Sequence, residues 1–162
     1  METTKERAEK TSELSRKGHQ AQLQGELGDA MRCYQESVQI HPTAEAHTFL
    51  GWTYSFLQRY EDAIEECRNA IAIDPAFGNP YNDIGLYLIR MGKLDAAVPW
   101  LERALTATHY DTRHYPHLNL GRIALAKGDL LKAACEFRRA LEVQPRSLTA
   151  RRTLAALSTQ LN

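Results

Sequence analysis

The side chains best suited to chemistry lie close together in the segment HYDTRHYPH, residues 109–117. His109, His114 and His117 supply imidazoles, and Asp111 supplies a carboxylate. Both groups can bind a metal ion. Their spacing is irregular and the segment lacks cysteine, so polar surface residues in an extended loop are the simpler interpretation. We therefore expect no metal site and no cofactor.

The sequence contains none of the common catalytic motifs. The phosphate-binding patterns GxxxxGK[ST] and GxGxxG are absent, as are HExxH and GxSxG. Cys33, Cys67 and Cys135 are scattered without CxxC spacing. This pattern argues against a disulfide framework or a zinc site and favours buried free thiols. The sequence predicts a protein that is not an enzyme.

Composition narrows the class of protein further. The chain has 162 residues, 43% hydrophobic and 25% charged, enough for one domain with a continuous core. Twenty basic and twenty acidic residues give a net charge of zero. Such a chain has no overall field to attract nucleic acid or an anionic membrane. The first residues carry no apolar run and no segment approaches a membrane span of ~18 apolar residues, so we expect a cytoplasmic protein.

One residue pattern recurs along the chain and indicates how the helices are arranged. Glycines lie 33, 34 and 36 residues apart, at Gly18, Gly51, Gly85 and Gly121. An alanine follows each glycine twelve residues later, at Ala30, Ala63, Ala97 and Ala133. Self-similarity at this period predicts a stacked array, in which each unit buries its apolar face against a neighbour.

These residues resemble the tetratricopeptide repeats, helix-turn-helix units of 34 residues. The best match is Leu50-Gly51-Trp52-Thr53-Tyr54 followed by Ala63 and Pro75. Over about residues 11–160 the resemblance implies an all-α, right-handed α-solenoid of four tandem units plus a C-terminal capping helix. The single repeat domain, 11–160, would hold repeats at about 11–43, 44–77, 78–113 and 114–147, with the capping helix at 148–160. We see no cap in residues 1–10, and expect them to be flexible or to extend the first helix.

Packing rules predict several details of this array. We expect Ala63, Ala97 and Ala133 where two helices cross, because close approach needs small side chains. Pro99 lies about one turn into its helix and predicts a late start or a bend there. The longer spacing before the fourth repeat predicts a long connection that projects from one edge. In the last helix, we expect these residues to face inward: Leu148, Leu154, Ala155 and Leu157.

The resemblance implies a concave groove lined by the first helix of each repeat. One helical step from the packed face gives these candidate groove residues: His19, Thr48, Phe49, Trp52, Phe56, Asn82, Asp83, Leu86, Tyr115, Asn119 and Arg122. Aromatic anchors flanked by amide and charged side chains suit an extended or helical peptide, whose backbone the asparagines can bond. The alternative is that Phe49, Trp52 and Phe56 are core residues.

The partner expected from this groove is another protein. Some tetratricopeptide proteins bind the carboxylate tails of chaperones through Lys, Asn and Arg side chains. The matching positions here supply no cation, so we predict no such binding; they are Ser15, His19, Phe49, Asn79 and Asp83. The favoured function is a scaffold or adaptor. Two alternatives are a self-associating structural subunit and a module that recruits substrates for a separate catalytic chain.

Overall fold

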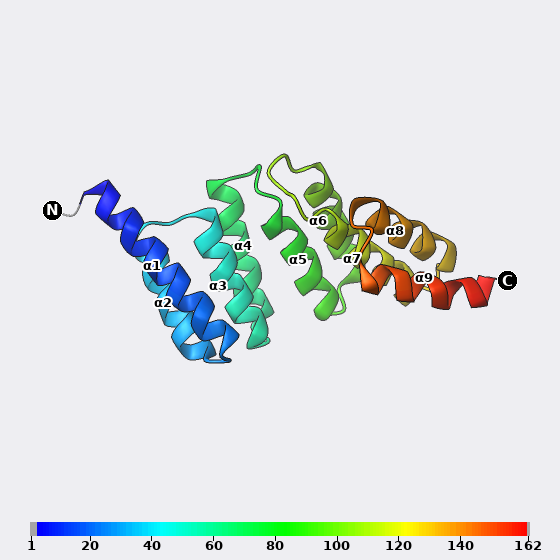
Figure 1. The fold of residues 1–162 in the computed structure, drawn as a ribbon, viewed down its shortest axis with the longest axis horizontal. Coiled ribbons are helices and arrows are strands. Elements are labelled where there is room, and N and C mark those ends of the chain that lie inside the picture. The colour runs from blue at the N-terminus through cyan, green and yellow to red at the C-terminus, as the bar shows by residue number, and fades with distance from the viewer. Residues whose placement is uncertain (1–2, 162) are drawn as a thin grey trace. The chain divides into compact units, whose positions relative to one another are not determined.

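The computed structural model describes residues 3–161, and within this range the chain forms nine α-helices and no β-strand (Figure 1). Their bounds are α1 Thr4–Leu23, α2 Leu27–Ile40, α3 Ala44–Phe56, α4 Tyr60–Ile73, α5 Asn79–Arg90, α6 Leu94–Thr106, α7 His114–Ala126, α8 Leu130–Val143 and α9 Leu148–Leu161. Short turns join the first eight helices into four hairpins, and α9 follows the last. The predicted all-α class, with four helix-turn-helix units and a final helix, is confirmed.

The helices fall into two compact units, which we describe separately. The first unit ends at Pro80 and holds α1 to α4, while the second begins at Tyr81, inside α5, and continues through α9. In the second unit, one apolar cluster joins α7, α8 and α9 around Phe137. Another cluster joins α6 to α7 around Leu101, and Leu88 of α5 packs against it.

The recurring glycines let the two helices of a hairpin approach closely. A Cβ atom added at Gly18 would lie 2.8 Å from the Tyr34 ring, and one at Gly121 would lie 2.9 Å from Phe137. At Gly85 the added atom would lie only 2.4 Å from Leu101. Each glycine thus leaves room for a large side chain sixteen residues later, on the second helix. This contact explains why the glycine recurs in the sequence.

The recurring alanines lie at the same joints, where a larger side chain would separate the helices. Ala63, Ala97 and Ala133 have no exposed surface, as expected for residues at helix crossings, and the carbonyl oxygens of Ala63 and Ala97 lie near Gly51 and Gly85. A second alanine, seven residues later in each of these hairpins, is equally buried at Ala70, Ala104 and Ala140.

The turns inside the hairpins require a left-handed backbone at one position. Gly25, Gly92 and Gly128 have φ angles of +78°, +75° and +76°. Glycine adopts this conformation without a Cβ clash. The equivalent residue of the α3/α4 turn is Gln58, with a φ angle of +59°. One hairpin therefore places a side chain where the other three have none.

Residues 4–10 extend the first helix, which is one of the two outcomes expected for them, but two details of the helix starts differ from expectation. The first helix has a capping box: the Thr3 side chain accepts from the Glu6 N–H, and the Glu6 carboxylate accepts from the Thr3 N–H at 2.7 Å. The T-x-x-E pattern that signals this cap was present in the sequence. Helix α6 begins at Leu94 and continues through Pro99, so of the late start or bend expected at Pro99, the late start does not occur.

The final helix faces inward with a different set of residues than expected. Leu148 is 65% exposed and Ala155 is also exposed, so both were assigned wrongly. Ala150 and Leu157 are buried, and Leu154 packs partly against the same cluster. Residues 150, 154 and 157 form one helical stripe, whereas the predicted set mixed two faces.

The connection between α6 and α7, residues 107–113, is the longest in the described chain, as predicted. Tyr110 in this connection is only 3% exposed, whereas His109 and Asp111 on either side of it are exposed, so the segment does not project as a whole. Burial raises the pKa of the Tyr110 phenol. The Arg113 guanidinium donates to the carbonyl oxygen of Ala107 at 2.6 Å, just past the end of α6. Helix ends need such donors, since their last carbonyls lack partners within the helix.

Candidate functional site

The first unit presents aromatic side chains from helix α3. The Phe49 ring stacks on Tyr34 of α2, with centroids 5.5 Å apart and planes 18° apart. Trp52 meets Phe49 edge to face at 5.4 Å. Tyr34 has no exposed surface, whereas Phe49 and Trp52 are half-buried and Phe56 is 61% exposed. We call Phe49, Trp52 and Phe56 the aromatic face: its inner ring is anchored in the core and its outer ring is open to solvent.

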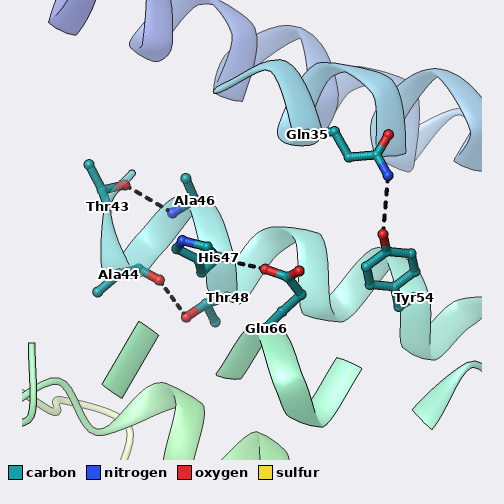
Figure 2. A network of polar contacts seen from close by, with 8 residues as sticks. All are labelled: Gln35, Thr43, Ala44, Ala46, His47, Thr48, Tyr54 and Glu66. Carbon is teal, nitrogen blue, oxygen red and sulfur yellow. Dashed lines mark hydrogen bonds and ion pairs between the residues drawn. The ribbon is translucent and has the colours of Figure 1, made fainter. Parts of the chain in front are cut away.

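The other two candidates of the first unit differ from each other. His19 on α1 is exposed. Thr48 is only 2% exposed, and its hydroxyl donates to the Ala44 carbonyl at 2.8 Å (Figure 2). The structure therefore gives Thr48 a contact within its own helix. Helices α2 and α3 are also joined by Gln35, which donates to the Tyr54 hydroxyl at 3.1 Å (Figure 2).

The second unit carries a line of polar side chains from α5 and α7. Arg122 donates to Asn119 Oδ1 at 2.8 Å, and Asn119 Nδ2 donates to Asn82 Oδ1 at 3.0 Å. Asn82 Nδ2 in turn lies 3.4 Å from Asp83 Oδ1. We call these four residues the amide chain. It begins at a guanidinium, ends at a carboxylate and ties the first helices of two successive hairpins together.

The two amides of this chain are buried. Asn82 is 7% exposed and Asn119 is 3% exposed, and they bond each other. Sequence reasoning expected asparagines that bond a guest backbone; in the structure their bonds hold α5 to α7. Asp83 is equally buried, at 7% exposed. The position of the bond was not visible in the sequence, because Asn82 and Asn119 lie 37 residues apart.

The remaining candidates of the second unit reach the surface. Leu86 is half-buried, Tyr115 is 49% exposed and Arg122 is exposed. Burial of part of the Arg122 guanidinium lowers its pKa, and the positive charge of Arg90 lowers it further. Two like charges therefore act on one another on this surface.

Two histidine–glutamate pairs, each joining the two helices of one hairpin, were not predicted from the sequence. His47 Nδ1 of α3 lies 2.6 Å from Glu66 Oε2 of α4 (Figure 2). His117 Nδ1 of α7 lies 2.8 Å from Glu136 Oε2 of α8. Both pairs span 19 residues and start four residues before the recurring glycine. Alignment of the repeats on that glycine would have revealed them.

In the α5/α6 hairpin, two aromatic side chains occupy the positions equivalent to the histidine and the glutamate. Tyr81 and Trp100 are also 19 residues apart, and their ring centroids lie 6.3 Å apart. The Arg103 guanidinium lies 4.7 Å from the centre of the Tyr81 ring and 5.3 Å from that of Trp100. In α8 the equivalent residue, Arg139, instead donates to Glu136 at 2.9 Å.

The histidines of residues 109–117 do not lie together in one extended loop. His114 and His117 belong to helix α7 rather than to an extended loop, and His114 packs on the Tyr115 ring at 4.1 Å. His117 is engaged with Glu136. Within residues 3–161, no three His, Cys, Asp or Glu side chains are arranged to hold a metal ion.

The cysteines are free thiols but are not all buried. Burial was predicted for all three thiols. Cys67 is buried and Cys33 is half-buried, whereas Cys135 is exposed, so the prediction is wrong for Cys135. No helix in the described part of the chain has the length and apolar character needed to span a membrane.

Comparisons with known proteins identify the fold. Family models of the tetratricopeptide repeat match residues 44–77 and 82–147, together more than half of the chain. The chain belongs to the tetratricopeptide repeat family. The resemblance inferred from the spaced glycines, alanines and prolines is therefore confirmed, as is the α-solenoid class.

Two known proteins resemble this chain at low sequence identity. The BBSome complex member BBS4 of Bos taurus is 26% identical over 140 residues, which are 86% of this chain and 26% of that protein. The small glutamine-rich tetratricopeptide repeat-containing protein 2 of Mycosarcoma maydis is 26% identical over 90 residues, 55% of this chain and 26% of that protein. The chain thus spans about a quarter of these curated relatives.

Solved structures with the same tetratricopeptide fold match most of the chain. The structure of Pseudomonas aeruginosa PilF superposes with a TM-score of 0.87 at 23% identity, over 95% of this chain and 70% of that one. The type IV pilus biogenesis factor PilW gives 0.83 at 20% identity, over 93% and 69%. At this identity the likeness concerns the fold alone. Tetratricopeptide proteins are generally protein–protein interaction modules.

Proposed function

We propose that this chain is a non-enzymatic scaffold or adaptor that binds a peptide or helix segment of another protein. The observation that carries the proposal is the aromatic face. Phe49 stacks on buried Tyr34 and Trp52 meets Phe49 edge to face, yet both Phe49 and Trp52 keep exposed surface. Rings that are fixed before binding lose little conformational freedom on contact with a guest, which favours binding at such positions.

The predicted groove residues divide into two roles in this proposal. Those that reach the surface would contact the guest: His19, Phe49, Trp52, Phe56, Leu86, Tyr115 and Arg122. Those that are buried would hold the lining helices in place: Thr48, Asn82, Asp83 and Asn119. These contacts are proposed for each unit by itself, with His19 and the aromatic face in the first unit and Leu86, Tyr115 and Arg122 in the second. Work in the cytoplasm is part of the same proposal, and a fluorescent fusion in the source cell would test it.

The test compares protein capture by matched variants. The full chain, Trp52→Ala, and a control variant, Leu131→Ala, would be used to capture partners, which are identified by mass spectrometry. Leu131 is 74% exposed on α8, a second helix, so its loss removes apolar surface away from the aromatic face. We expect Trp52→Ala to lose a partner that the control keeps. Identical partner sets for both variants would contradict the aromatic face as the binding surface.

Self-association is the second candidate function. It is favoured by apolar side chains that are exposed outside the first helices of the hairpins, including Val143 at 45% and Leu148 at 65%. Sedimentation at several concentrations separates the two functions. A mass that rises with concentration in the parent chain and stays constant in Leu148→Ser would favour the structural subunit.

A further inference from the structure

Charge is distributed unevenly between the two units of this chain. Among Lys, Arg, Asp and Glu side chains, residues 1–80 hold eight basic and thirteen acidic ones, a net charge of −5. Residues 81–162 hold twelve basic and seven acidic ones, a net charge of +5. The zero net charge of the whole chain conceals this difference. Each unit is therefore electrostatically complementary to the other unit of a second copy.

The positive charge of the second unit is greatest in its last part. From Leu130 onward the chain holds six basic and two acidic residues. One of the two acids, Glu136, is buried and already contacts His117 and Arg139. Helices α8 and α9 pack together through one apolar cluster, and α9 has no acidic residue. We call the basic end the four exposed arginines that form no ion pair within residues 3–161: Arg138, Arg146, Arg151 and Arg152.

The negative charge of the first unit is greatest on helix α4, which holds four acidic residues and one basic residue. Glu61 and Glu65 are exposed and lie four residues apart, so they share one face of the helix. Within the described chain, Glu61 forms no ion pair. Glu65 lies 3.6 Å from Arg68, with both side chains more than half exposed, and such pairs contribute little to stability. We call Glu61 and Glu65 the acidic face.

Exposed apolar side chains lie beside both charged surfaces. Ile73, at the end of α4, is 46% exposed. Leu148 is 65% exposed and precedes Arg151 by three residues, so the two lie on the same face of α9. Opposite charges bring two surfaces together and fix their register, whereas burial of apolar area supplies much of the stabilisation. Each surface thus offers both kinds of contact.

The two charged surfaces do not include the candidate groove residues. The acidic face belongs to α4, the second helix of its hairpin. The basic end belongs to α8, the second helix of its hairpin, to α9 and to the segment between them. The candidate groove residues lie on the first helices. A contact through the charged surfaces therefore leaves those residues available to a guest.

We propose that the acidic face of one copy binds the basic end of a second copy, so that the chains associate head to tail. The contact joins two different surfaces and is therefore heterologous, which leads to a ring or an open filament. The inference rests on self-association, the second candidate function, and gives it an interface. A nucleic acid suits the basic end less well, because the thirteen acidic residues of the first unit would repel its phosphates.

The test is sedimentation of the full 162-residue chain at several concentrations. We expect the average mass to rise with concentration at about 0.05 M salt and to fall towards that of the monomer at about 0.5 M, since salt screens exposed charges. Two double variants remove one surface each without reversing its charge: Glu61→Gln with Glu65→Gln, and Arg151→Gln with Arg152→Gln. Each should weaken self-association about tenfold.

A mixture of the two double variants is the most specific measurement. The first variant keeps the basic end and the second keeps the acidic face, so one intact interface forms between them. We expect a 1:1 dimer that grows no further, at concentrations where each variant alone is a monomer. The matched control, Arg90→Gln with Lys93→Gln, removes two positive charges from exposed residues elsewhere in the second unit and should leave the association unchanged. Thermal melts would verify that each variant folds.

Three outcomes would overturn the inference. They are a parent chain that stays monomeric at low salt, a mixture that forms no dimer, and equal weakening by the arginine variant and its control. Binding of a monomeric chain to vesicles of anionic phospholipid through Arg151 and Arg152 would mean that the basic end has a different partner.

Self-association and its proposed interface fail in different ways. If the association is insensitive to salt and to the arginine variant but is lost in Leu148→Ser, self-association stands and the charge pairing is wrong. Capture of a partner by the aromatic face is measured separately with Trp52→Ala, so its result does not depend on this interface.

Discussion

Three hairpins of this protein have a side-chain pair at the same place between their two helices, and the pair is of two different kinds. In α3/α4 and α7/α8, a histidine four residues before the glycine meets a glutamate fifteen residues after it. In α5/α6 the same two positions hold Tyr81 and Trp100, whose rings lie 6.3 Å apart. The residue three positions beyond Glu136 and Trp100 is an arginine in both cases, Arg139 and Arg103.

The hairpins therefore share the position of this contact between their helices, here called the joint, but not the type of interaction made there. An arginine at one position donates to a carboxylate in α8 and lies over rings in α6. A guanidinium suits both roles, since it forms fork-like bonds to carboxylates and stacks on aromatic faces. The repeat therefore conserves geometry along the chain while its polar contacts vary.

The largest effect is expected at the glycine of the α5/α6 hairpin. In Gly85→Ala the added Cβ would lie 2.4 Å from Leu101, which has no exposed surface and little room to move. We expect the free energy of unfolding to fall by about 2 kcal/mol, because overpacking exceeds the gain of about 1 kcal/mol in helix propensity. Urea unfolding of the full chain would measure the change.

Gly51→Ala in the α3/α4 hairpin is the matched control. Its added Cβ would lie 3.1 Å from the Ala63 carbonyl oxygen and 3.5 Å from Cys67 Sγ, a milder conflict. We expect a loss of about 1 kcal/mol or less, since the propensity gain offsets much of the strain. Equal losses for the two variants would show that the hairpins are packed alike at their glycines.

The second prediction compares the two histidine–glutamate pairs. Glu136 contacts both His117 and Arg139, whereas Glu66 contacts His47 (Figure 2). We expect Glu136→Gln to cost about 2 kcal/mol and Glu66→Gln about 1 kcal/mol, because charge-assisted bonds contribute more than neutral ones. The same urea experiment ranks them, and a reversed order would mean that Arg139 adds nothing.

The sequence predicted the fold well because the determinants of the fold repeat. The glycine and the alanine twelve residues later recur four times along the chain, and three of the glycines, Gly18, Gly85 and Gly121, precede a large residue by sixteen positions. Each copy supports the interpretation of the others. A packing rule that is uncertain for one helix therefore becomes firm for an array of them.

The candidate site was harder to predict because a helix face is assigned to within about one residue. Thr48 and Phe49 are neighbours, yet Thr48 is 2% exposed while Phe49 is half-buried and stacks on Tyr34. Burial of Asn82 and Asn119 depends on a bond between residues 37 positions apart. Such contacts arise from stacking of hairpins, which the local period does not describe.

The third prediction concerns variants that replace the aromatic pair of α5/α6 with a histidine–glutamate pair. Trp100→Glu alone should destabilise the second unit by about 1 kcal/mol or more, because it replaces a ring contact with a charge beside Tyr81. The double variant Tyr81→His with Trp100→Glu restores the residue pair found in α7/α8 and leaves Arg103 in the place of Arg139.

A double-mutant cycle tests whether the two joints are interchangeable. We expect a favourable coupling of about 1 kcal/mol between the two substitutions, within the range measured for contacting residues. Tyr81→His alone serves as the other corner of the cycle. A coupling near zero would show that the histidine–glutamate joint depends on features of α7/α8 beyond these three positions.

The smallest expected effect concerns the turns, where α3/α4 again differs from the other hairpins. Gln58 adopts a φ angle of +59°, in the region where its equivalents are Gly25, Gly92 and Gly128. A left-handed backbone strains a residue with a Cβ by about 1–2 kcal/mol, and part of this is offset because glycine is more flexible in the unfolded chain. We expect Gln58→Gly to raise the free energy of unfolding by about 0.5–1 kcal/mol.

The reverse change in α5/α6 provides the control for this turn. Gly92→Ala has open space around its added Cβ, with nothing within 4 Å, so any loss of stability reports the φ angle of +75° rather than a clash. We expect a loss of about 1 kcal/mol. Urea unfolding in which Gln58→Gly is destabilised, or in which Gly92→Ala is unchanged, would mean that the turns tolerate a side chain at this position. The recurring glycine of the turns would then reflect something other than backbone strain.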